Sequence, residues 1–313
     1  MCTSLRFQHI REVLPMINVR PRRPISLERK TQRIGWMFII PALALVVLTH
    51  FYPMFETLLL SLQSGKANNL KWAGMRNYVR LFKDATFLAA LENTLFYLVV
   101  QIPVMLSLAL ILAVLVNDRK LKGRGIYRTL IFLPAVTSLA SCSIIFLRLF
   151  ANDGYINTLL LNTGVISEYI DFLANKWSAR AIIILVMTWR WTGTNMIYFL
   201  SGLQNIDDSL YEAAAIDGAT GVQAFTRITM PLLKPTLLLT TITSTTGTMK
   251  LFDEVYNITG GGPANGTITL SNYLYQLCFG GVPQYGYASA IAYIIFLIAA
   301  LLAFIQMKVG DKE

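Results

Sequence analysis

The sequence is dominated by apolar stretches that are each about as long as a lipid bilayer is thick. A hydrocarbon core of about 30 Å requires roughly 20 apolar residues in a helix. We expect a membrane-spanning helix at each of six stretches: residues 36–60, 90–116, 129–150, 180–201, 235–256 and 287–307. In lipid, a helix satisfies all of its own backbone hydrogen bonds. The sequence therefore predicts an all-α polytopic membrane protein with six transmembrane helices.

The composition supports this class. Hydrophobic residues make up 55% of the 313 residues and charged residues only 14%, whereas soluble domains carry about 25% charged residues. The three cysteines, Cys2, Cys142 and Cys278, are far apart and form no CxxC pair. We therefore expect neither a disulfide framework nor a metal site.

The basic residues predict the orientation in the membrane. Eight of them lie in residues 1–35 and five in residues 117–128, whereas residues 257–286 contain none. Cytoplasmic loops carry the excess of Lys and Arg. We therefore expect a basic cytoplasmic tail at 1–35, a six-helix transmembrane domain at 36–307 and a cytoplasmic tail at 308–313. The five basic residues of the loop at 63–87 fit this orientation less well.

The charge and the methionines of the N-terminal region each lead to a further expectation. Most of the net charge of +10 is explained by the basic residues that orient the chain in the membrane. Because no basic surface interleaved with aromatic residues remains, we expect no nucleic-acid partner. Met1 and Met16 are both possible start residues.

A polar insert separates the fourth and fifth expected spans, with the sequence YEAAAIDGATGVQAFTRITMPLLKP at residues 211–235. Asp207 or Asp208 is suited to cap a first helix. Gly218 is suited to end this helix in left-handed geometry. The pattern predicts a helical hairpin on the cytoplasmic side, within a loop at residues 202–234.

The second helix of this hairpin has its own signals. Thr220 and Gln223 have the spacing of a capping box. We expect Pro231 to end the helix and Pro235 to begin the next span, where a missing N–H costs little.

The first helix of the hairpin presents three small side chains, Ala213–Ala215, flanked by Glu212 and Asp217. Small side chains allow another protein to approach closely, and carboxylates can pair with its Lys or Arg. The alternative is a helix pair that lies on lipid headgroups, which predicts Lys and Arg on the polar face. The acidic character of the first helix favours a protein partner.

Several motifs in this order resemble permease subunits of bacterial ABC importers. Glu212-Ala213-Ala214, Asp217-Gly218-Ala219 and Ile228-x-Met230-Pro231 resemble their EAA loop, with Met230 where Leu is usual. Four further segments resemble the maltose-transporter-like carbohydrate permeases: WAGMRNYVRLFKD (72–84), FLPAVTSLASCSIIFLRLFANDGYIN (132–157), NITGGGPANGT (257–267) and YGYASAIAYIIF (285–296).

The resemblance covers nearly the whole chain and implies the type I ABC importer permease fold. It implies a second homologous permease, two copies of an ABC ATPase subunit, an extracytoplasmic solute-binding protein and a sugar substrate in a bacterial inner membrane. The chain has no GxxxxGK[ST] phosphate loop, so ATP and Mg are expected on the separate ATPase. By the resemblance, the ATPase-coupling residues are Tyr211, Glu212, Ala213, Ala214, Asp217, Gly218, Ala219 and Arg227.

The fourth span supplies the first candidates for a substrate pathway. Arg190 lies near its centre, between Trp189 and Trp191, with Asn195 about one turn away. Ionisable residues at membrane depth face a cavity or a partner, and sugars stack on aromatic rings and bind planar polar groups. Since the resemblance implies that this span lines the cavity, we expect Trp189 and Asn195 to contact substrate. Trp191 points to a different side of the helix, where it can face lipid.

The fifth span is unusually rich in Ser, Thr and Gly, which line helix interfaces or water-filled cavities in lipid. Its candidate pathway residues are Thr245, Gly247, Thr248, Lys250, Asp253 and Tyr256. Two structural alternatives remain open. Arg190 can form an ion pair with Asp253 or Glu254, and Lys250 can pair with Asp253 at i, i+3.

Two other function classes are less well supported. A self-sufficient secondary transporter commonly contains internal repeats, and no convincing repeat is present. A membrane enzyme requires a catalytic constellation, but the chain has no HExxH motif and its only histidines are His9 and His50. We therefore expect no catalytic residue in this chain. The substrate can be an oligosaccharide, a monosaccharide or a polyol phosphate.

Overall fold

The computed structural model describes residues 25–67, 69–118 and 120–310. Residues 1–24 of the expected N-terminal tail, Met16 among them, and residues 311–313 of the expected C-terminal tail lie outside the described residues. The chain divides into two compact units, residues 1–55 and 56–313. Each unit is described by itself.

Helices form almost all of the regular structure. In chain order the elements are α1 (Ile25–Val46), the π-helix η1 (Val47–Phe51), α2 (Tyr52–Ser61), β1 (Gln63–Lys66), β2 (Asn69–Trp72), α3 (Arg76–Leu81), α4 (Ala85–Asn117), α5 (Arg124–Val136), α6 (Leu139–Leu149), α7 (Tyr155–Asn162), α8 (Lys176–Gln204), α9 (Asp208–Ile216), α10 (Gly221–Ala224), the π-helix η2 (Phe225–Thr229), α11 (Met230–Met249), α12 (Asp253–Ile258), α13 (Leu270–Phe279) and α14 (Tyr285–Gly310).

The first unit consists mainly of the helix α1 and the turn η1. Large apolar side chains are exposed on this helix, among them Trp36, Met37 and Phe38. In water this exposure is unfavourable, because each buried apolar side chain contributes about 1.5–3 kcal/mol. The helical stretch Ile34–Ser61 is long and apolar enough to cross a membrane, which agrees with a span expected at 36–60.

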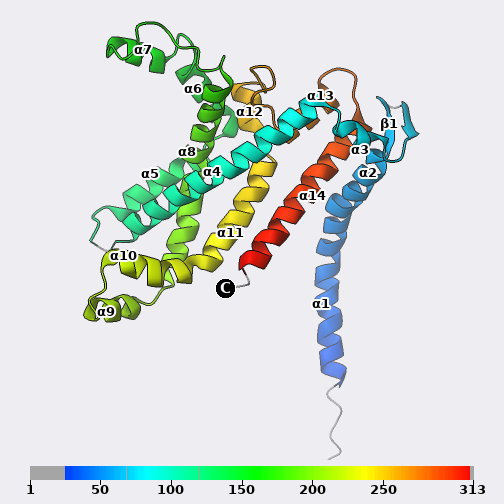
Figure 1. Ribbon diagram of the computed structural model, residues 1–313. Helices are drawn as coiled ribbons and strands as arrows, with labels where there is room; N and C mark the ends of the chain where they lie inside the picture. Colours follow the sequence, from blue (N-terminus) through cyan, green and yellow to red (C-terminus); the bar gives the residue numbers. More distant parts are fainter. Residues whose placement is uncertain (1–24, 68, 119, 311–313) are drawn as a thin grey trace, which may run out of the picture. The chain divides into compact units, whose positions relative to one another are not determined.

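The second unit is built around four long helices. α4 packs against α8, α11 packs against both α4 and α14, and α5 packs on the outer side of α8. Figure 1 shows α9 and α10 at one end of these helices and α7, α12 and α13 at the opposite end. The core between α4, α8 and α11 contains Met105, Met196, Phe199 and Leu233, all buried.

Three described helical stretches are long and apolar enough to span a membrane: Ile34–Ser61, Ala85–Asn117 and Tyr285–Gly310. A bent pair, α5 with α6, adds a fourth if it is one span. The expected fourth span lies within α8 and the expected fifth begins within α11, but both helices carry more polar side chains. Six transmembrane helices therefore remain a prediction.

The expected third span at 129–150 is not one continuous helix. α5 and α6 meet at an angle of 95°. Pro134 lies in the last turn of α5, and Thr137 and Ser138 adopt extended backbone with ψ of 151° and 130°. The helix therefore ends after Val136 and restarts at Leu139.

The expected fifth span at 235–256 is also interrupted. α11 ends at Met249, and the short helix α12 begins at Asp253. Lys250 and Asp253 therefore do not share a helix, and among the described residues no ion pair joins them. The Lys250–Asp253 pair considered as an alternative is not formed, because the i, i+3 spacing rule assumes one continuous helix.

The expected end of the cytoplasmic hairpin at Pro231 is wrong as well. The backbone continues without a break from α10 through the π-helix η2 into α11, and Pro231 lies in the first turn of α11. A π-helical turn inserts an extra residue into a helix. Proline is tolerated in a first helical turn.

A two-stranded hairpin is the main departure from an all-helical chain. β1 and β2 are antiparallel, with Gln63 opposite Trp72 and Lys66 opposite Asn69. It lies at the same end of the second unit as α13. Asn77 donates hydrogen bonds to the carbonyl oxygens of Ser61 at 2.8 Å and Gln63 at 2.7 Å. These contacts fix the chain between α2 and α3.

At the α13 end, one carboxylate joins three helices. Asp84 caps α4 through the amides of Thr86 and Phe87, and its other oxygen accepts hydrogen bonds from the hydroxyls of Tyr273 at 2.6 Å and Tyr287 at 2.7 Å. Partial burial alone would raise the pKa of Asp84, but the hydrogen bonds from Tyr273 and Tyr287 and from the two amides hold it below its usual value. The start of α4 is thereby tied to α13 and α14.

Candidate functional site

The hairpin predicted at residues 202–234 forms as two short helices with their expected caps. Asp207 accepts a hydrogen bond from the amide of Ser209 at 3.0 Å and so caps α9. Gly218 has a φ of +75° and ends the helix in left-handed geometry. Thr220 and Gln223 form the complete capping box of α10.

The hairpin is open to its surroundings. α9 contains no buried residue, and Glu212, Ala213 and Asp217 are exposed. Two large apolar residues that the sequence interpretation did not select, Ile216 and Val222, are 87% and 74% exposed. Exposed apolar side chains beside carboxylates are typical of a surface that another protein covers.

Three of the remaining coupling candidates, Tyr211, Ala214 and Ala219, make contacts within the hairpin. The hydroxyls of Tyr211 and Thr229 lie 2.8 Å apart, which joins α9 to the turn η2. Ala214 and Ala219 are half-buried, and the amide of Ala219 donates to the carbonyl oxygen of Ala214 at 2.9 Å. Arg227 is exposed, one turn before α11.

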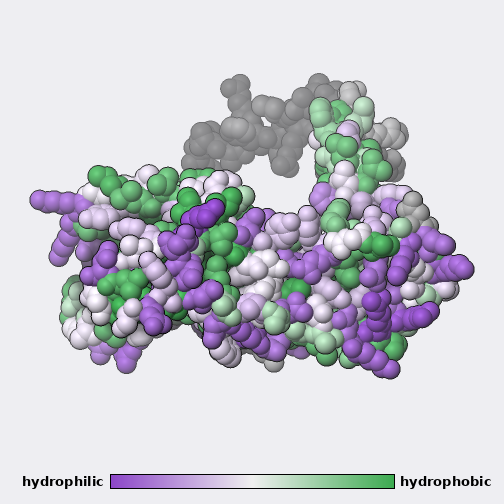
Figure 2. All heavy atoms as spheres, turned by 90° about the horizontal axis from the view of Figure 1, so that it is seen from above, coloured by the Kyte–Doolittle hydropathy of each residue, from purple (hydrophilic) through white to green (hydrophobic). Residues whose placement is uncertain are grey.

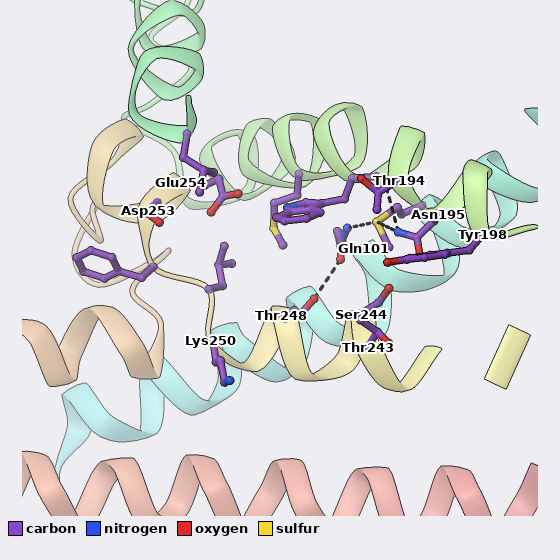
Figure 3. A pocket seen from close by; sticks show the side chains of 17 residues that line it. Gln101, Thr194, Asn195, Tyr198, Thr243, Ser244, Thr248, Lys250, Asp253 and Glu254 are labelled. Atoms are coloured by element: carbon purple, nitrogen blue, oxygen red, sulfur yellow. Dashed lines mark hydrogen bonds between the residues drawn. The ribbon is translucent and has the colours of Figure 1, made fainter. Parts of the chain in front are cut away.

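A cavity of about 320 Å³ lies between α4, α8, α11 and the start of α12. Sites for small molecules have volumes of about 300–1,000 Å³ and combine apolar walls with a few polar groups. The lining residues are Gln101, Met105, Leu139, Met187, Trp191, Thr194, Asn195, Tyr198, Thr243, Ser244, Gly247, Thr248, Lys250, Leu251, Phe252, Asp253 and Glu254. Figure 3 shows the carboxylates of Asp253 and Glu254 at one end and Thr194, Asn195 and Tyr198 at the other.

The cavity brings together five of the predicted pathway residues: Asn195, Gly247, Thr248, Lys250 and Asp253. Side chains of its wall are also joined to one another. Thr248 donates to the Oε1 atom of Gln101 at 3.3 Å, and Asn195 donates to the sulfur of Met105 at 3.6 Å. The Lys250 side chain extends away from Asp253 and Glu254 (Figure 3).

Four predicted pathway residues do not line this cavity: Trp189, Arg190, Thr245 and Tyr256. Trp189 packs edge-on against Phe146 with ring centroids 5.3 Å apart. Trp191 lines the cavity in its place, because successive helix positions about 100° apart point to different sides. Thr245 accepts a hydrogen bond from Gln306 of α14 at 2.8 Å.

Arg190 stabilises the break between α5 and α6. Its guanidinium donates to the carbonyl oxygens of Thr137 at 2.8 Å and Pro134 at 3.4 Å. Thr137 is the residue that follows α5, and the Pro134 oxygen also accepts hydrogen bonds from the amide and the hydroxyl of Thr137. Among the described residues no ion pair includes Arg190, so the ion pair considered with Asp253 or Glu254 is not formed.

A second buried arginine, which the sequence interpretation did not select, fixes the glycine-rich loop at 257–267. Arg180 is 1% exposed. It donates to the carbonyl oxygen of Gly266 and to the carboxylate of Glu92, both at 3.0 Å, and to Asn93. Asn93 in turn donates to the carbonyl oxygens of Asn265 and Ile268. Because Arg180 lies near the end of a span, the sequence does not distinguish it from a lipid-facing basic residue.

The chemistry available in the cavity is binding by hydrogen bonds and ring contacts. It offers hydroxyls, amides and carboxylates together with the rings of Trp191, Tyr198 and Phe252. Within the described ranges no group of three or more His, Cys, Asp or Glu could hold a metal ion. This arrangement suits a polar molecule with apolar faces.

Comparison with known families gives one match over most of the chain. Residues 79–311 match the family described as "Binding-protein-dependent transport system inner membrane component". The chain is 49% identical over 290 residues to the lactose transport system permease protein LacF of Rhizobium radiobacter, which covers 92% of this chain and 97% of LacF. It is 31% identical over 288 residues to the trehalose/maltose transport system permease protein MalF of Thermococcus litoralis, covering 91% and 96%.

Comparison with solved structures gives a similar fold. One chain in the crystal structure of a bacterial ABC transporter involved in the import of the acidic polysaccharide alginate superposes with a TM-score of 0.81. The match covers 92% of this chain and 98% of the other at 22% sequence identity. At this level of identity the likeness shows a common fold.

Proposed function

Because the chain belongs to the family of binding-protein-dependent transport system inner membrane components, we propose that it is the permease subunit of an ATP-driven ABC importer for a sugar. It is a multi-pass membrane protein with the type I importer permease fold that the sequence predicts. Its relatives include permeases named for lactose, arabinooligosaccharides, and trehalose and maltose. A di- or oligosaccharide is therefore the best supported substrate class.

The observation that carries this proposal is the path of two helices between the hairpin and the cavity. α8 contributes Met187, Trp191, Thr194, Asn195 and Tyr198 to the cavity and leads into the hairpin. On the far side of the hairpin, α10 and η2 continue directly into α11, which contributes Thr243, Ser244, Gly247 and Thr248. A movement of the hairpin is therefore passed to two walls of the cavity.

The hairpin is the docking element for an ATPase in this proposal. Glu212 and Asp217 offer charge to basic side chains of the partner, and Ile216 and Val222 offer apolar contact. ATP and Mg are bound by the ATPase, of which two copies serve this chain and a second, homologous permease. Closure of the ATPases moves each hairpin and turns the cavity from the cytoplasmic to the external side, an alternating-access cycle.

The cavity holds the sugar in transit. Asn195, Thr248 and Asp253 are placed to hydrogen-bond sugar hydroxyls, and Trp191 to stack on a ring face. An extracytoplasmic solute-binding protein delivers the sugar at the end that carries α12 and α13. Both termini, the loop at 117–128 and the hairpin then lie in the cytoplasm, and the chain resides in a bacterial inner membrane.

The test is purification and reconstitution of the native complex. The chain is solubilised mildly from its own membrane, its bound subunits are identified, and the complex is placed in vesicles with ATP and the binding protein. We expect a second permease and an ATPase, with ATP hydrolysis and uptake stimulated by one sugar, lactose being the first to test. A chain that purifies alone and transports sugar without ATP would identify a secondary transporter and overturn the proposal.

A further inference from the structure

Four aromatic rings form a continuous row that begins at the cavity wall. Phe252 and Tyr256 stack with centroids 5.2 Å apart, and Tyr275 of α13 lies 4.9 Å from Phe252 and 5.2 Å from Tyr256. Phe279 follows one turn later on α13, 4.9 Å from Tyr275. The row therefore joins two segments that a glycine-rich loop separates in the chain.

The row leads from the cavity to the outer surface. Phe252 belongs to the cavity wall. At the other end Phe279 is 71% exposed, and Tyr256 between them is 45% exposed. α12 and α13 lie at the end of the second unit opposite the hairpin (Figure 1). Each position along the row is thus reachable from outside or from the cavity.

These rings are not part of the hydrophobic core. None of the four belongs to the buried clusters formed by the described residues. Tyr273, two residues before Tyr275, packs against such a cluster and donates to Asp84 instead. Seen from above, this end of the unit carries hydrophilic residues interspersed with apolar ones (Figure 2). A row of half-exposed rings among hydrophilic residues suits a ligand that has both apolar and polar surfaces.

A sugar has both characters, with apolar C–H faces and a polar rim. Resting on the proposed function, we propose that Phe252, Tyr256, Tyr275 and Phe279 form an access path along which a sugar moves from the binding protein into the cavity. The sugar moves along the path by stacking its faces on successive rings. At the inner end Asp253, next to Phe252, accepts hydrogen bonds from the arriving hydroxyls.

The sugar contacts are distributed over four rings, so each ring binds the sugar only weakly. Aromatic contacts contribute about 0.5–1.5 kcal/mol each. Weak contacts in series suit transit, since binding must be strong enough to enter and weak enough to leave. Tyr275 is the central member because it contacts the other three rings.

The test compares variants of the complete transport complex in vesicles. Tyr275→Ala and Phe279→Ala remove rings, Tyr275→Phe keeps the ring, and Tyr169→Ala removes an exposed tyrosine outside the row (56% exposed). Uptake is measured at limiting concentrations of sugar-loaded binding protein, with ATP hydrolysis and co-purification of the second permease measured in parallel. We expect Tyr275→Ala and Phe279→Ala to slow uptake about two- to tenfold, the factor that corresponds to one aromatic contact. ATP hydrolysis stimulated by the binding protein is retained, as is uptake by Tyr275→Phe and Tyr169→Ala.

Two results would overturn the access path. One is unchanged uptake in both alanine variants. The other is loss of the second permease from the purified complex of either variant, which would make the row a contact between subunits. ATP-driven sugar uptake by the unchanged complex tests the proposed function separately, so failure of the path leaves that function standing.

Discussion

The guanidinium of Arg190 donates a hydrogen bond of 2.8 Å to the carbonyl oxygen of Thr137, across the break where α5 and α6 meet at 95°. Through this contact α8 holds the bend that brings Leu139, the first residue of α6, to the cavity wall. Arg190 thus influences the cavity indirectly: it hydrogen-bonds the backbone at the bend and does not line the cavity itself.

Replacing Arg190 by methionine removes the guanidinium that donates to the carbonyl oxygen of Thr137. Hydrogen bonds to a charged group contribute about 1.5–3 kcal/mol, so we expect Arg190→Met to lower the thermal unfolding temperature of the detergent-solubilised complex. Arg190→Lys should recover part of the loss. The exposed Arg148 of α6 serves as the control: Arg148→Gln should leave the unfolding temperature unchanged. Equal unfolding temperatures for Arg190→Met and the unchanged complex would contradict the supporting role.

Reversing the charge of Glu212 tests the docking of the hairpin. In the proposed docking, a lysine at this position would meet basic side chains of the ATPase with like charge, and like-charge contacts at interfaces cost several kcal/mol. We therefore expect Glu212→Lys to reduce uptake at least about tenfold and to weaken retention of the ATPase. Delivery by the binding protein should be unaffected. Glu168→Lys makes the same change at an exposed position of the α7 end and should preserve both properties. Full ATPase retention in Glu212→Lys would refute the assignment.

Asp84 predicts a pH dependence of stability. Its pKa is below the usual value in the folded protein, so its stabilising contribution is complete above the unfolded pKa of about 3.9. It is lost as the pH falls through the lower folded value. Asp84→Asn cannot accept from Tyr273 and Tyr287 in the same way. We therefore expect the variant to unfold at a lower temperature at pH 7, with the difference shrinking as the pH falls below about 4. A difference that is constant from pH 7 to pH 3 would exclude the carboxylate as its source.

Two of the three tryptophans of α8, Trp189 and Trp191, should separate sugar binding from helix packing. Trp191 lines the cavity, so Trp191→Ala should weaken apparent sugar affinity about two- to tenfold, as expected for one aromatic contact. Trp189→Ala removes the contact with Phe146 and should change stability while leaving affinity intact. Sugar-dependent ATP hydrolysis, titrated in both variants, measures this, and a larger affinity loss in Trp189→Ala would reverse the assignment.

Gly193 allows α8 to approach α5. A Cβ atom there would lie 2.3 Å from the carbonyl oxygen of Ile131 and 2.9 Å from the Cα of Phe132. Overpacking of this kind costs about 1–3 kcal/mol, so Gly193→Ala should lower the unfolding temperature. A Cβ at Gly125, on α5 itself, meets nothing within 4 Å. Gly125→Ala should therefore be neutral or slightly stabilising, and the same shift in both variants would argue against close packing at Gly193.

The local elements of the hairpin could be predicted from the sequence because their signals are local. Asp207, Gly218 and the Thr220–Gln223 box each act within a few residues, and each has its predicted conformation. The apolar helices could be predicted for the same reason, since their length and composition are continuous in the chain.

The breaks and the cavity wall could not be predicted in this way. At the bend after Pro134 the contact comes from a guanidinium of α8, and at the end of α11 Ser271 donates to the carbonyl oxygen of Met249; both partners are distant in sequence. From the sequence alone Trp191 can face lipid, because a helix has two sides and the sequence does not say which of them meets the cavity. Gln101, on α4, reaches the cavity only through packing of helices distant in sequence.

The π-helical turn η2 sets the phase of the helix that follows it. Each residue of a helix turns the chain by about 100°, and η2 contains one residue more per turn than an α-helix. Shortening this turn by one residue would rotate α11 relative to the hairpin by about 100° and turn the side that carries Thr243, Ser244 and Thr248 away from the cavity. The number of residues in η2 thereby determines which side of α11 faces the cavity.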